Sequence, residues 1–478
     1  MTKAAPPAGG ITGRRSLRPL AAVLAATAVS LTGTRVSAIA LPWFVLVTTG
    51  SATQTGLVAF CEMTPYVVVK ALTGPLVDRV GPRVVSWTTD SLSAVAAGLV
   101  PLLYAVDLLP FWLLLALVAV IGAVRGPGDL AKEIMVPEAA ERSAVPLERA
   151  TGISGVTERL ASTVGPAAGG ALVALLGPQA GLVVNAACFA LGSVIIGLAL
   201  PRDMGHTTEP PAPPEGGKEP GYWRRFGEGF TFLRGEPLLL TIIVTVGITN
   251  LLDAAFMTVL VPVWAKESGG GPAAIGLISS VAGITAVLGS LVAAAVAHRL
   301  RRRLVFFAGF LIVGAPRFLV LASGAPMWAV LVVFAVGGFG GGFLNPILGA
   351  ISFERVPRQL LGRVRALGDS LAWAGIPLGG LLAGAAVASF GLVPVLVAGG
   401  GAYFLTTTLA GLRPEWREMD RLRGVGRAPD EVPGADGPSP SPHAGGSVRP
   451  DAGRGATAGA REKEMPRSAP DVMCAAGL

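Results

Sequence analysis

The stretch from Leu20 to Val47 is LAAVLAATAVSLTGTRVSAIALPWFVLV, and Arg35 is its only charged residue. A helix needs about 20 consecutive apolar residues to cross a bilayer core, so this stretch is long enough to do so. Comparable stretches recur along the chain, and we expect twelve membrane-spanning helices. Their predicted ranges are 20–47, 55–77, 84–105, 110–134, 149–175, 179–200, 236–264, 273–297, 303–322, 327–350, 363–388 and 391–412.

The composition agrees with a chain that lies mostly in lipid. Of the 478 residues, 52 % are hydrophobic and only 14 % are charged. A soluble protein carries roughly 25 % charged residues, so most of this surface must face the lipid bilayer. The net charge of +8 does not indicate a nucleic-acid partner, because the basic residues cluster between the apolar stretches and in the tail. The sequence therefore predicts an all-α membrane protein.

Composition also divides the chain into five segments. The linker is rich in proline between Glu209 and Pro220, and the aromatic and basic residues from Tyr222 to Arg234 predict a short helix on the membrane surface. The tail is rich in Gly, Pro, Ala, Arg and Ser, a composition that favours disorder. The predicted segments are an N-terminal cytoplasmic segment 1–19, a six-helix bundle 20–200, a central cytoplasmic linker 201–235, a second six-helix bundle 236–412 and a cytoplasmic tail 413–478.

Basic residues collect in alternate loops, which predicts the orientation of the chain. Cytoplasmic loops of membrane proteins carry an excess of Lys and Arg. With the N-terminus inside, each of several inner loops holds two or more arginines, such as Arg79 with Arg83, whereas Lys266 is the only Lys or Arg in the short outer loops. We therefore expect a multi-pass protein of a bacterial-type plasma membrane with both termini in the cytoplasm.

The two halves of the chain contain an internal repeat. At an offset of 220 residues, Gly56 aligns with Gly276, and Arg83 aligns with Arg303. At a slightly smaller offset, Pro166 with Gly169-Gly170 resembles Pro377 with Gly379-Gly380. Because helix-breaking residues stay in register, the halves are expected to share one fold. Repeated halves place a binding site at their interface, near the middle of the membrane.

Two glycine-containing patterns lie in the first half. The loop between the second and third predicted spans is Gly74-Pro-Leu-Val-Asp78-Arg79-Val-Gly81-Pro-Arg83. Asp78 lies beside two arginines at a helix end, where it can accept charge-assisted hydrogen bonds and hold one conformation. The fifth span contains Gly152 and then Gly165-Pro166-Ala-Ala-Gly169-Gly170. These small residues allow close helix packing, and the proline removes one backbone donor.

The first pattern resembles the signature loop of the major facilitator superfamily (MFS), and the resemblance covers roughly residues 16–415. The second pattern is similar to the antiporter motif of the drug-exporting branches, with Ala161 where glycine is usual. The segment from Ala40 to Ala52 resembles the branch that contains macrolide and siderophore exporters. In the second copy of the loop, His298 replaces the acid and Ala294 the glycine. We therefore do not expect that copy to latch in the same way.

The resemblance implies twelve transmembrane helices in two pseudo-symmetric six-helix bundles, and a monomer. It also implies that the loop between the second and third spans forms the inner gate of a rocker-switch transporter. The glycine pattern in the fifth span is, by the same resemblance, associated with export. The implied gate residues are Gly74, Asp78, Arg79, Gly81 and Arg83, and the implied antiporter-motif residues are Gly152, Gly165, Pro166, Gly169 and Gly170.

Ionisable and polar residues inside the predicted spans are candidates for coupling or substrate binding, because burying them in a membrane is costly. These candidates are Arg35, Glu62, Asp90, Arg125, Asp129, Asn250 and Asp253. From their depth, we expect Arg35 and Glu62 to pair or to flank the cavity, and Asp90 to pair with Arg125. Asp129 lies one helical turn from Arg125, on the same face.

Two interpretations stay open for the acidic candidates. Glu62 fits either a carboxylate that binds and releases the coupling proton or one half of a structural ion pair. Asp253 shares a helix face with Asn250 and fits either a coupling or substrate contact or a hydrogen bond between helices. Arg317 lies near the outer end of its span, where we expect it to extend towards the interface.

The sequence predicts no enzyme, cofactor or metal site. It contains no Gly-x-x-x-x-Gly-Lys-Ser/Thr pattern for a nucleotide, and its three histidines are scattered. The predicted function is a secondary active transporter that exports a small molecule, such as a drug, antibiotic or metabolite, in exchange for protons. Two alternatives remain: an importer of a nutrient or metabolite on the same scaffold, and a membrane receptor or scaffold that transports nothing.

Overall fold

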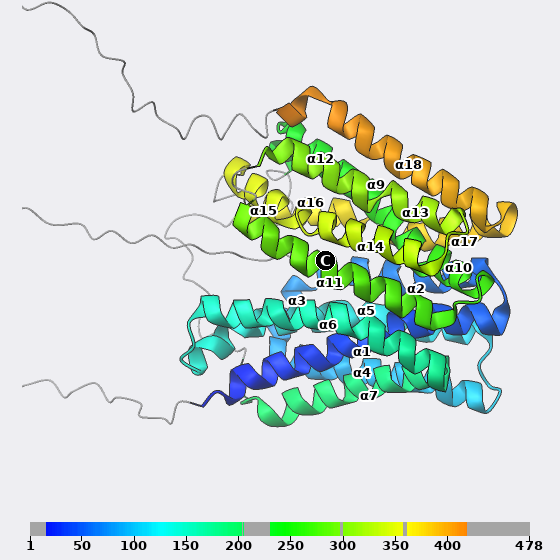
Figure 1. Ribbon diagram of the computed structural model, residues 1–478. Coiled ribbons are helices and arrows are strands. Elements are labelled where there is room, and N and C mark those ends of the chain that lie inside the picture. Colours follow the sequence, from blue (N-terminus) through cyan, green and yellow to red (C-terminus); the bar gives the residue numbers. More distant parts are fainter. Residues whose placement is uncertain (1–15, 203, 205–229, 297–299, 357–360, 418–478) are drawn as a thin grey trace, which may run out of the picture.

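The structure is a computed structural model that describes residues 16–202, 204, 230–296, 300–356 and 361–417. Within these ranges every regular element is a helix, and the long helices lie side by side along one axis (Figure 1). The interfacial helix and the tail predicted from the sequence lie mostly or wholly outside the described residues.

The described part of the N-terminal half contains seven helices. They are α1 (Arg18–Thr49), α2 (Ala52–Leu72), α3 (Gly74–Val80), α4 (Pro82–Ala105), α5 (Phe111–Arg142), α6 (Leu147–Leu176) and α7 (Pro178–Ala199). The C-terminal half contains more and shorter helices, because several of its spans are broken. They are α9 (Pro237–Ala255), the π-helix η1 (Phe256–Leu260), α10 (Val261–Glu267), α11 (Gly271–Val296), α12 (Arg302–Val313), α13 (Ala315–Ala322), α14 (Met327–Gly341), α15 (Leu344–Arg355), α16 (Leu361–Trp373), α17 (Ile376–Phe390), α18 (Leu392–Leu412) and the short 3-10 turn η3 (Pro414–Arg417).

Eleven segments of the described chain are long and apolar enough to cross a membrane. The helix α4 is not among them, because polar residues such as Thr88, Thr89 and Asp90 lower its hydropathy. It is nevertheless 24 residues long, and it packs along both α5 and α7. With α4 counted as a span, the described residues contain the expected twelve crossings, and the all-α membrane fold is confirmed.

Tight turns define the two ends of the molecule. At the Gly50 end, Gly50 adopts a φ of 68° and closes α1, and Ser51 accepts a hydrogen bond from the Gln54 amide to begin α2. Only glycine adopts such a φ without strain, so the chain reverses within two residues. The opposite end is the Gly81 end. The start of α1 and the end of α18 both lie there, on the left of Figure 1.

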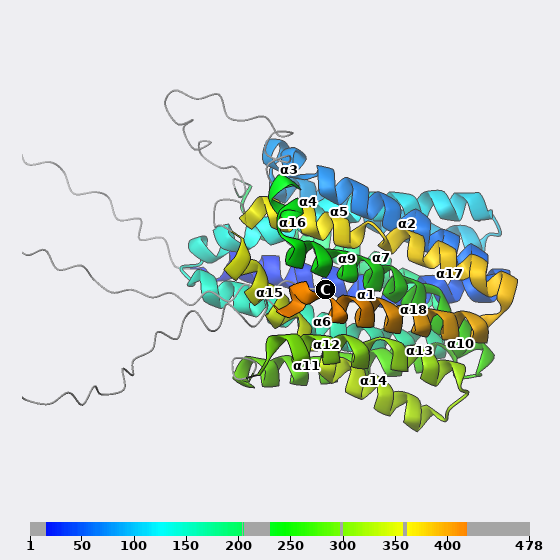
Figure 2. The same ribbon diagram turned by 90° about the horizontal axis from the view of Figure 1, so that it is seen from above.

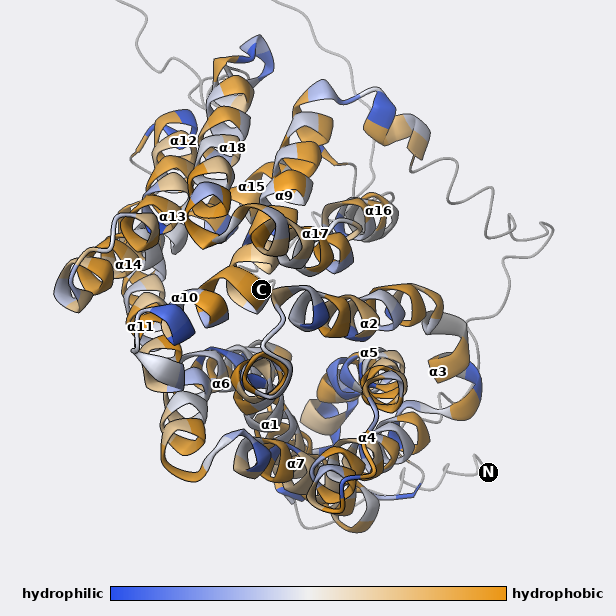
Figure 3. Cartoon of the chain, turned by 90° about the vertical axis from the view of Figure 1, so that its right-hand side faces the viewer, coloured by the Kyte–Doolittle hydropathy of each residue, from blue (hydrophilic) through white to orange (hydrophobic). Residues whose placement is uncertain are grey.

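Two seams of small residues join the halves. The helix α2 lies along α17, and α6 lies along α11 (Figures 2 and 3). In the first seam, Gly56 faces the backbone of Gly380, and the Thr53 hydroxyl donates to the Gly384 carbonyl at 3.2 Å. In the second, a methyl group at Gly170 would lie 2.8 Å from the Cα of Gly276. Both seams therefore depend on residues without side chains.

The seams are related by the repeat in the sequence. Gly56 aligns with Gly276, and Gly170 aligns with Gly380. In the structure, Gly56 contacts Gly380, and Gly276 contacts Gly170. The two seams are therefore equivalent contacts, which the repeat relates to each other. Near the same end, the Lys266 ammonium donates to the Leu46 carbonyl at 3.1 Å across the two halves. The described contacts between the bundles are therefore concentrated from the middle of the helices to the Gly50 end.

Candidate transport site between the bundles

An ion pair joins α2 to α5 inside the N-terminal bundle. Arg125 Nη1 lies 2.8 Å from Glu62 Oε1, and the two side chains are 11 % and 19 % exposed. The helices come this close because Gly122 faces the Glu62 backbone, where no side chain would fit. The Arg125 guanidinium also lies over the Tyr66 ring, 4.4 Å from its centre. A charge-assisted bond and a cation–π contact thus hold one arginine.

The same face of α2 reaches the C-terminal half. Lys70 Nζ lies 3.5 Å from the Tyr66 hydroxyl and 5.1 Å from the centre of the Trp373 ring on α16. Glu62, Tyr66 and Lys70 follow one another at intervals of four residues, so they line one stripe of the helix. This stripe links the ion pair to the other bundle. The spacing was visible in the sequence, but Tyr66 and Lys70 were missed as candidates.

Arg35 lies near the middle of α1, and its side chain passes over Gly165 of α6. A methyl group at Gly165 would lie 2.5 Å from the Arg35 Cβ. Asp129 and Glu158 are close enough to attract the Arg35 charge, and Arg125 is close enough to repel it. Arg35 nevertheless makes no hydrogen bond or ion pair with the residues that the structure describes, and its Nε is buried without a partner.

The predicted pairing of Asp90 with Arg125 is wrong, and so is the pairing alternative for Arg35 and Glu62, whereas their place beside the cavity stays a prediction. Glu62 pairs with Arg125 and not with Arg35, and Asp90 pairs with Lys132 at 2.8 Å and not with Arg125. Ser30 lies 3.0 Å from the Lys132 ammonium and 3.3 Å from Asp90. Lys132 lies inside the predicted span 110–134 but was missed as a candidate, and it is two helical turns beyond Arg125 on α5, at the level where Asp90 lies. Both side chains of that pair are 4 % exposed, so it is a buried ion pair.

Asn250 and Asp253 contact different neighbours. The Asn250 amide donates to the Ala372 carbonyl at 3.0 Å, whereas Asp253 forms an ion pair with Arg317 of α13. The Arg317 guanidinium lies 4.8 Å from the centre of the Phe256 ring and 5.5 Å from that of Tyr403. The expectation that Arg317 extends to the membrane interface is therefore wrong. A break between α12 and α13 at Gly314, against which the Tyr403 ring packs, turns Arg317 inward.

The antiporter-like motif, which lies on α6, contacts two different helices. Gly165 and Gly169 lie against Arg35 and Val36 of α1, whereas Gly170 and the Pro166 carbonyl lie against Gly276 of α11. The motif thus packs one helix of its own bundle and one of the other. Gly152 differs from the rest, since a methyl group there would meet nothing within 4 Å.

The predicted gate loop folds into α3 and the turn at Gly81. Gly81 has a φ of 88°, and Arg83 donates to the Gly197 carbonyl at 2.7 Å, which ties the start of α4 to the end of α7. Arg79 is exposed, and Gly74 begins α3. The side chain of Asp78 and residues 297–299, with His298, lie outside the described part, so the latch role of Asp78 stays a prediction.

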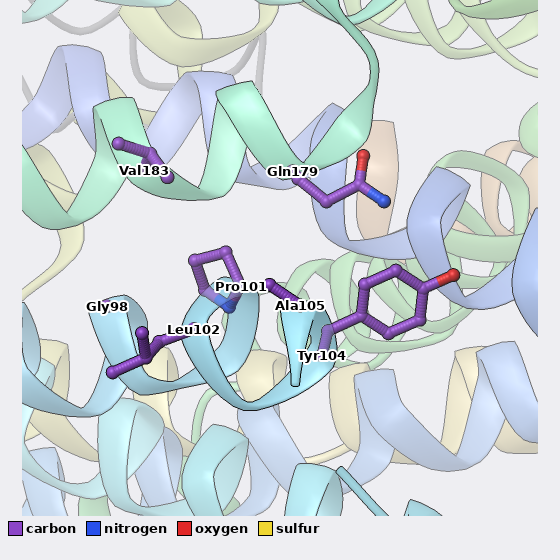
Figure 4. Close-up of a pocket in the computed structure, with 7 residues that line it drawn as sticks. All are labelled: Gly98, Pro101, Leu102, Tyr104, Ala105, Gln179 and Val183. Carbon is purple, nitrogen blue, oxygen red and sulfur yellow. The ribbon is translucent and has the colours of Figure 1, made fainter. Parts of the chain in front are cut away.

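A groove at the outer wall of the N-terminal bundle is a poor alternative site. It lies between α4 and α7 near the Gly50 end (Figure 4). Its lining is Gly98, Pro101, Leu102, Tyr104, Ala105, Gln179 and Val183. Of the lining residues, only Tyr104 and Gln179 offer polar side chains. The helices α4 and α7 lie on the side of the N-terminal bundle that faces away from the C-terminal half (Figure 3). Among the described residues, no group of three or more His, Cys, Asp or Glu side chains is placed to hold a metal ion.

Two curated relatives cover nearly the whole fold. The chain is 30 % identical over 406 residues to the "Multidrug efflux pump Tap" of Mycolicibacterium fortuitum, which covers 84 % of this chain and 97 % of the relative. It is 32 % identical over 414 residues to the protein of the same name from Mycobacterium tuberculosis (strain ATCC 25618 / H37Rv), covering 84 % and 95 %.

Solved structures share the architecture at low sequence identity. The nucleoside transporter NupG superposes with a TM-score of 0.66 at 13 % identity, covering 84 % of this chain and 99 % of that one. A bacterial homolog of the human lysosomal transporter Spinster, in an inward-facing and unoccupied conformation, gives 0.59 at 14 %, covering 88 % and 100 %.

The family model of the Major Facilitator Superfamily matches residues 23–266 and 243–450, which together include both bundles. The match agrees with the two six-helix halves and with the curated relatives. The chain therefore belongs to the Major Facilitator Superfamily, as a transporter of its drug-exporter branch.

Proposed function

We propose that this chain exports small molecules from the cytoplasm in exchange for protons, by alternating access between its two bundles. The observation that carries the proposal is the Glu62–Arg125 pair, in which a carboxylate inside a membrane span has one arginine partner at 2.8 Å. The network around it reaches the other bundle through Lys70 and Trp373. The names of the two curated relatives support export as the direction.

Protonation of Glu62 is the proposed coupling step. A proton on the carboxyl removes its negative charge, and the bond to Arg125 then loses most of its electrostatic attraction. Arg125 and Tyr66 then become free to rearrange. Because Lys70 contacts both Tyr66 and Trp373, this rearrangement also alters the contact with α16. Proton binding at Glu62 thereby shifts the balance between the two states of the transporter.

The closed Gly50 end is the proposed outer side. One-sided loop charge supports an orientation with both termini in the cytoplasm of a bacterial-type plasma membrane. With that orientation, the seams at Gly56–Gly380 and Gly170–Gly276 close the outer side, so this conformation takes substrate from the cytoplasm. The seams separate when substrate leaves, and Asp78 with Arg79 and Arg83 then closes the inner side. One chain suffices for this cycle, so we propose a monomer.

The proposal is tested with purified protein in liposomes. Rhodamine 123, a lipophilic cationic dye, should accumulate in vesicles whose interior is acidic, with the membrane potential clamped, and the accumulation should end when an ionophore dissipates the pH gradient. In cells, expression should lower dye accumulation and drug susceptibility. Expression that raises accumulation would support an importer, and no change in flux for any compound in a drug panel would support a receptor or scaffold.

A further inference from the structure

Arg35 is a cation inside a membrane span that has no partner in the described structure. It lies near the middle of the 32-residue helix α1. Arg125, Lys132 and Arg317 also lie inside spans, and each has a carboxylate partner: Glu62, Asp90 and Asp253 respectively. A charged side chain without a partner at this depth is costly, and such residues mark substrate or ion pathways.

The position of Arg35 places it at the interface between the bundles. Ile39 and Leu46, on α1 towards the Gly50 end, belong to the hydrophobic core of the C-terminal half together with Phe256 and Ile278. Arg35 is one helical turn from Ile39 on the same face. It therefore lies just on the Gly81 side of the apolar contact that closes the Gly50 end.

The stem of Arg35 is held while its charged end is not. Gly165 packs against the Cβ and Cγ atoms, so the start of the side chain is fixed against α6. Glu62 already accepts from Arg125. Asp129 and Glu158 attract Arg35 from α5 and α6, but neither forms an ion pair with it. A fixed stem and a guanidinium without a bound acid make a pre-organised hydrogen-bond donor for a ligand oxygen.

We propose that Arg35 is a substrate anchor that binds a carboxylate, or a comparable anionic oxygen group, of the exported molecule. The planar guanidinium donates two parallel hydrogen bonds to such a group. Substrates that carry an anionic group alongside an apolar body are then favoured over their neutral esters. This inference rests on the proposed export function, since it names the chemistry of the molecule carried by that site.

A matched pair of dyes tests the anchor. Rhodamine 110 carries a free carboxylate, and rhodamine 123 is its methyl ester. Binding of each dye to the full-length purified chain is measured by fluorescence anisotropy, without any gradient. The wild-type chain should bind rhodamine 110 about tenfold more tightly than rhodamine 123. Arg35→Gln should abolish this preference, and Arg35→Lys should keep part of it. Arg149→Gln, at an exposed position at the start of α6, should leave it unchanged.

The outcomes separate this inference from the proposed function. Equal affinities in the wild-type chain, no binding of rhodamine 110, or an unchanged preference in Arg35→Gln would each overturn the anchor, even if proton-driven export is observed. A carboxylate preference that depends on Arg35, in a chain whose dye flux ignores the pH gradient, would support the anchor and contradict proton-coupled export. A correctly folded Arg35→Gln chain is established by its size-exclusion profile and thermal midpoint.

Discussion

Gly170 of α6 and Gly276 of α11 face each other so closely that a methyl group at Gly170 would lie 2.8 Å from the Cα of Gly276. The two residues come from different bundles, and their counterparts in the repeat, Gly380 and Gly56, meet in the same way. Closure of the Gly50 end is therefore built from two related backbone contacts. Any transport cycle that opens this end must separate both.

The contact between Gly170 and Gly276 predicts that the rate of efflux depends strongly on side-chain size at these positions. In Gly170→Ala, the added methyl overpacks the contact, which costs about 1–3 kcal/mol and weakens the state closed at the Gly50 end. We expect a several-fold slower dye efflux in liposomes. Gly155→Ala on the same helix is the matched control, because its methyl meets nothing within 4 Å and should leave efflux unchanged. Wild-type efflux by Gly170→Ala would show that this contact does not form during transport.

The Glu62–Arg125 pair predicts energetic coupling between the two residues. Glu62→Gln or Arg125→Gln alone leaves one partly buried charge without its partner, and we expect a loss of about 2 kcal/mol in stability. The double variant should lose less than the sum of the single losses. Thermal unfolding of the purified chains gives the four values of this double-mutant cycle. Additive losses would mean that the two side chains do not interact in the membrane.

We expect the buried Asp90–Lys132 pair to contribute to the stability of the chain and not to its efflux activity. Both side chains are 4 % exposed, so Asp90→Asn should cost about 3–5 kcal/mol by leaving Lys132 buried and unpaired. The double variant Asp90→Leu/Lys132→Met removes both charges and should recover most of that stability. Its efflux per folded molecule should equal that of wild type. A stable double variant without efflux would place the pair in the transport machinery.

Much of the fold follows from local patterns in the sequence. Apolar length, loop charge and repeated glycines each depend on neighbouring residues along the chain, and they predict spans and halves. Pairing of buried charges depends on helix length and rotation, which a few residues change. Asp90 meets Lys132, which lies two helical turns beyond Arg125 on α5, and the break at Gly314 turns Arg317 towards Asp253. Arg35 was identified from sequence, but its lack of a partner required coordinates.

The break at Gly314 predicts compensation between two positions. The Tyr403 ring, which is 1 % exposed, occupies the space that a side chain at Gly314 would need. Gly314→Ala should therefore lower the thermal midpoint markedly, and Tyr403→Leu should lower it through the cavity that it leaves. The chain with both changes should be more stable than the sum of the two losses predicts. Strictly additive losses would contradict the contact.

In the proposed cycle, Glu62 couples proton movement to export. The most direct measurement compares wild type with Glu62→Gln in liposomes that are acidic inside, with the membrane potential clamped, by following rhodamine 123 accumulation. We expect gradient-driven accumulation by wild type and none by a folded Glu62→Gln chain that still binds the dye. Equal accumulation by the two chains would remove Glu62 from the coupling mechanism.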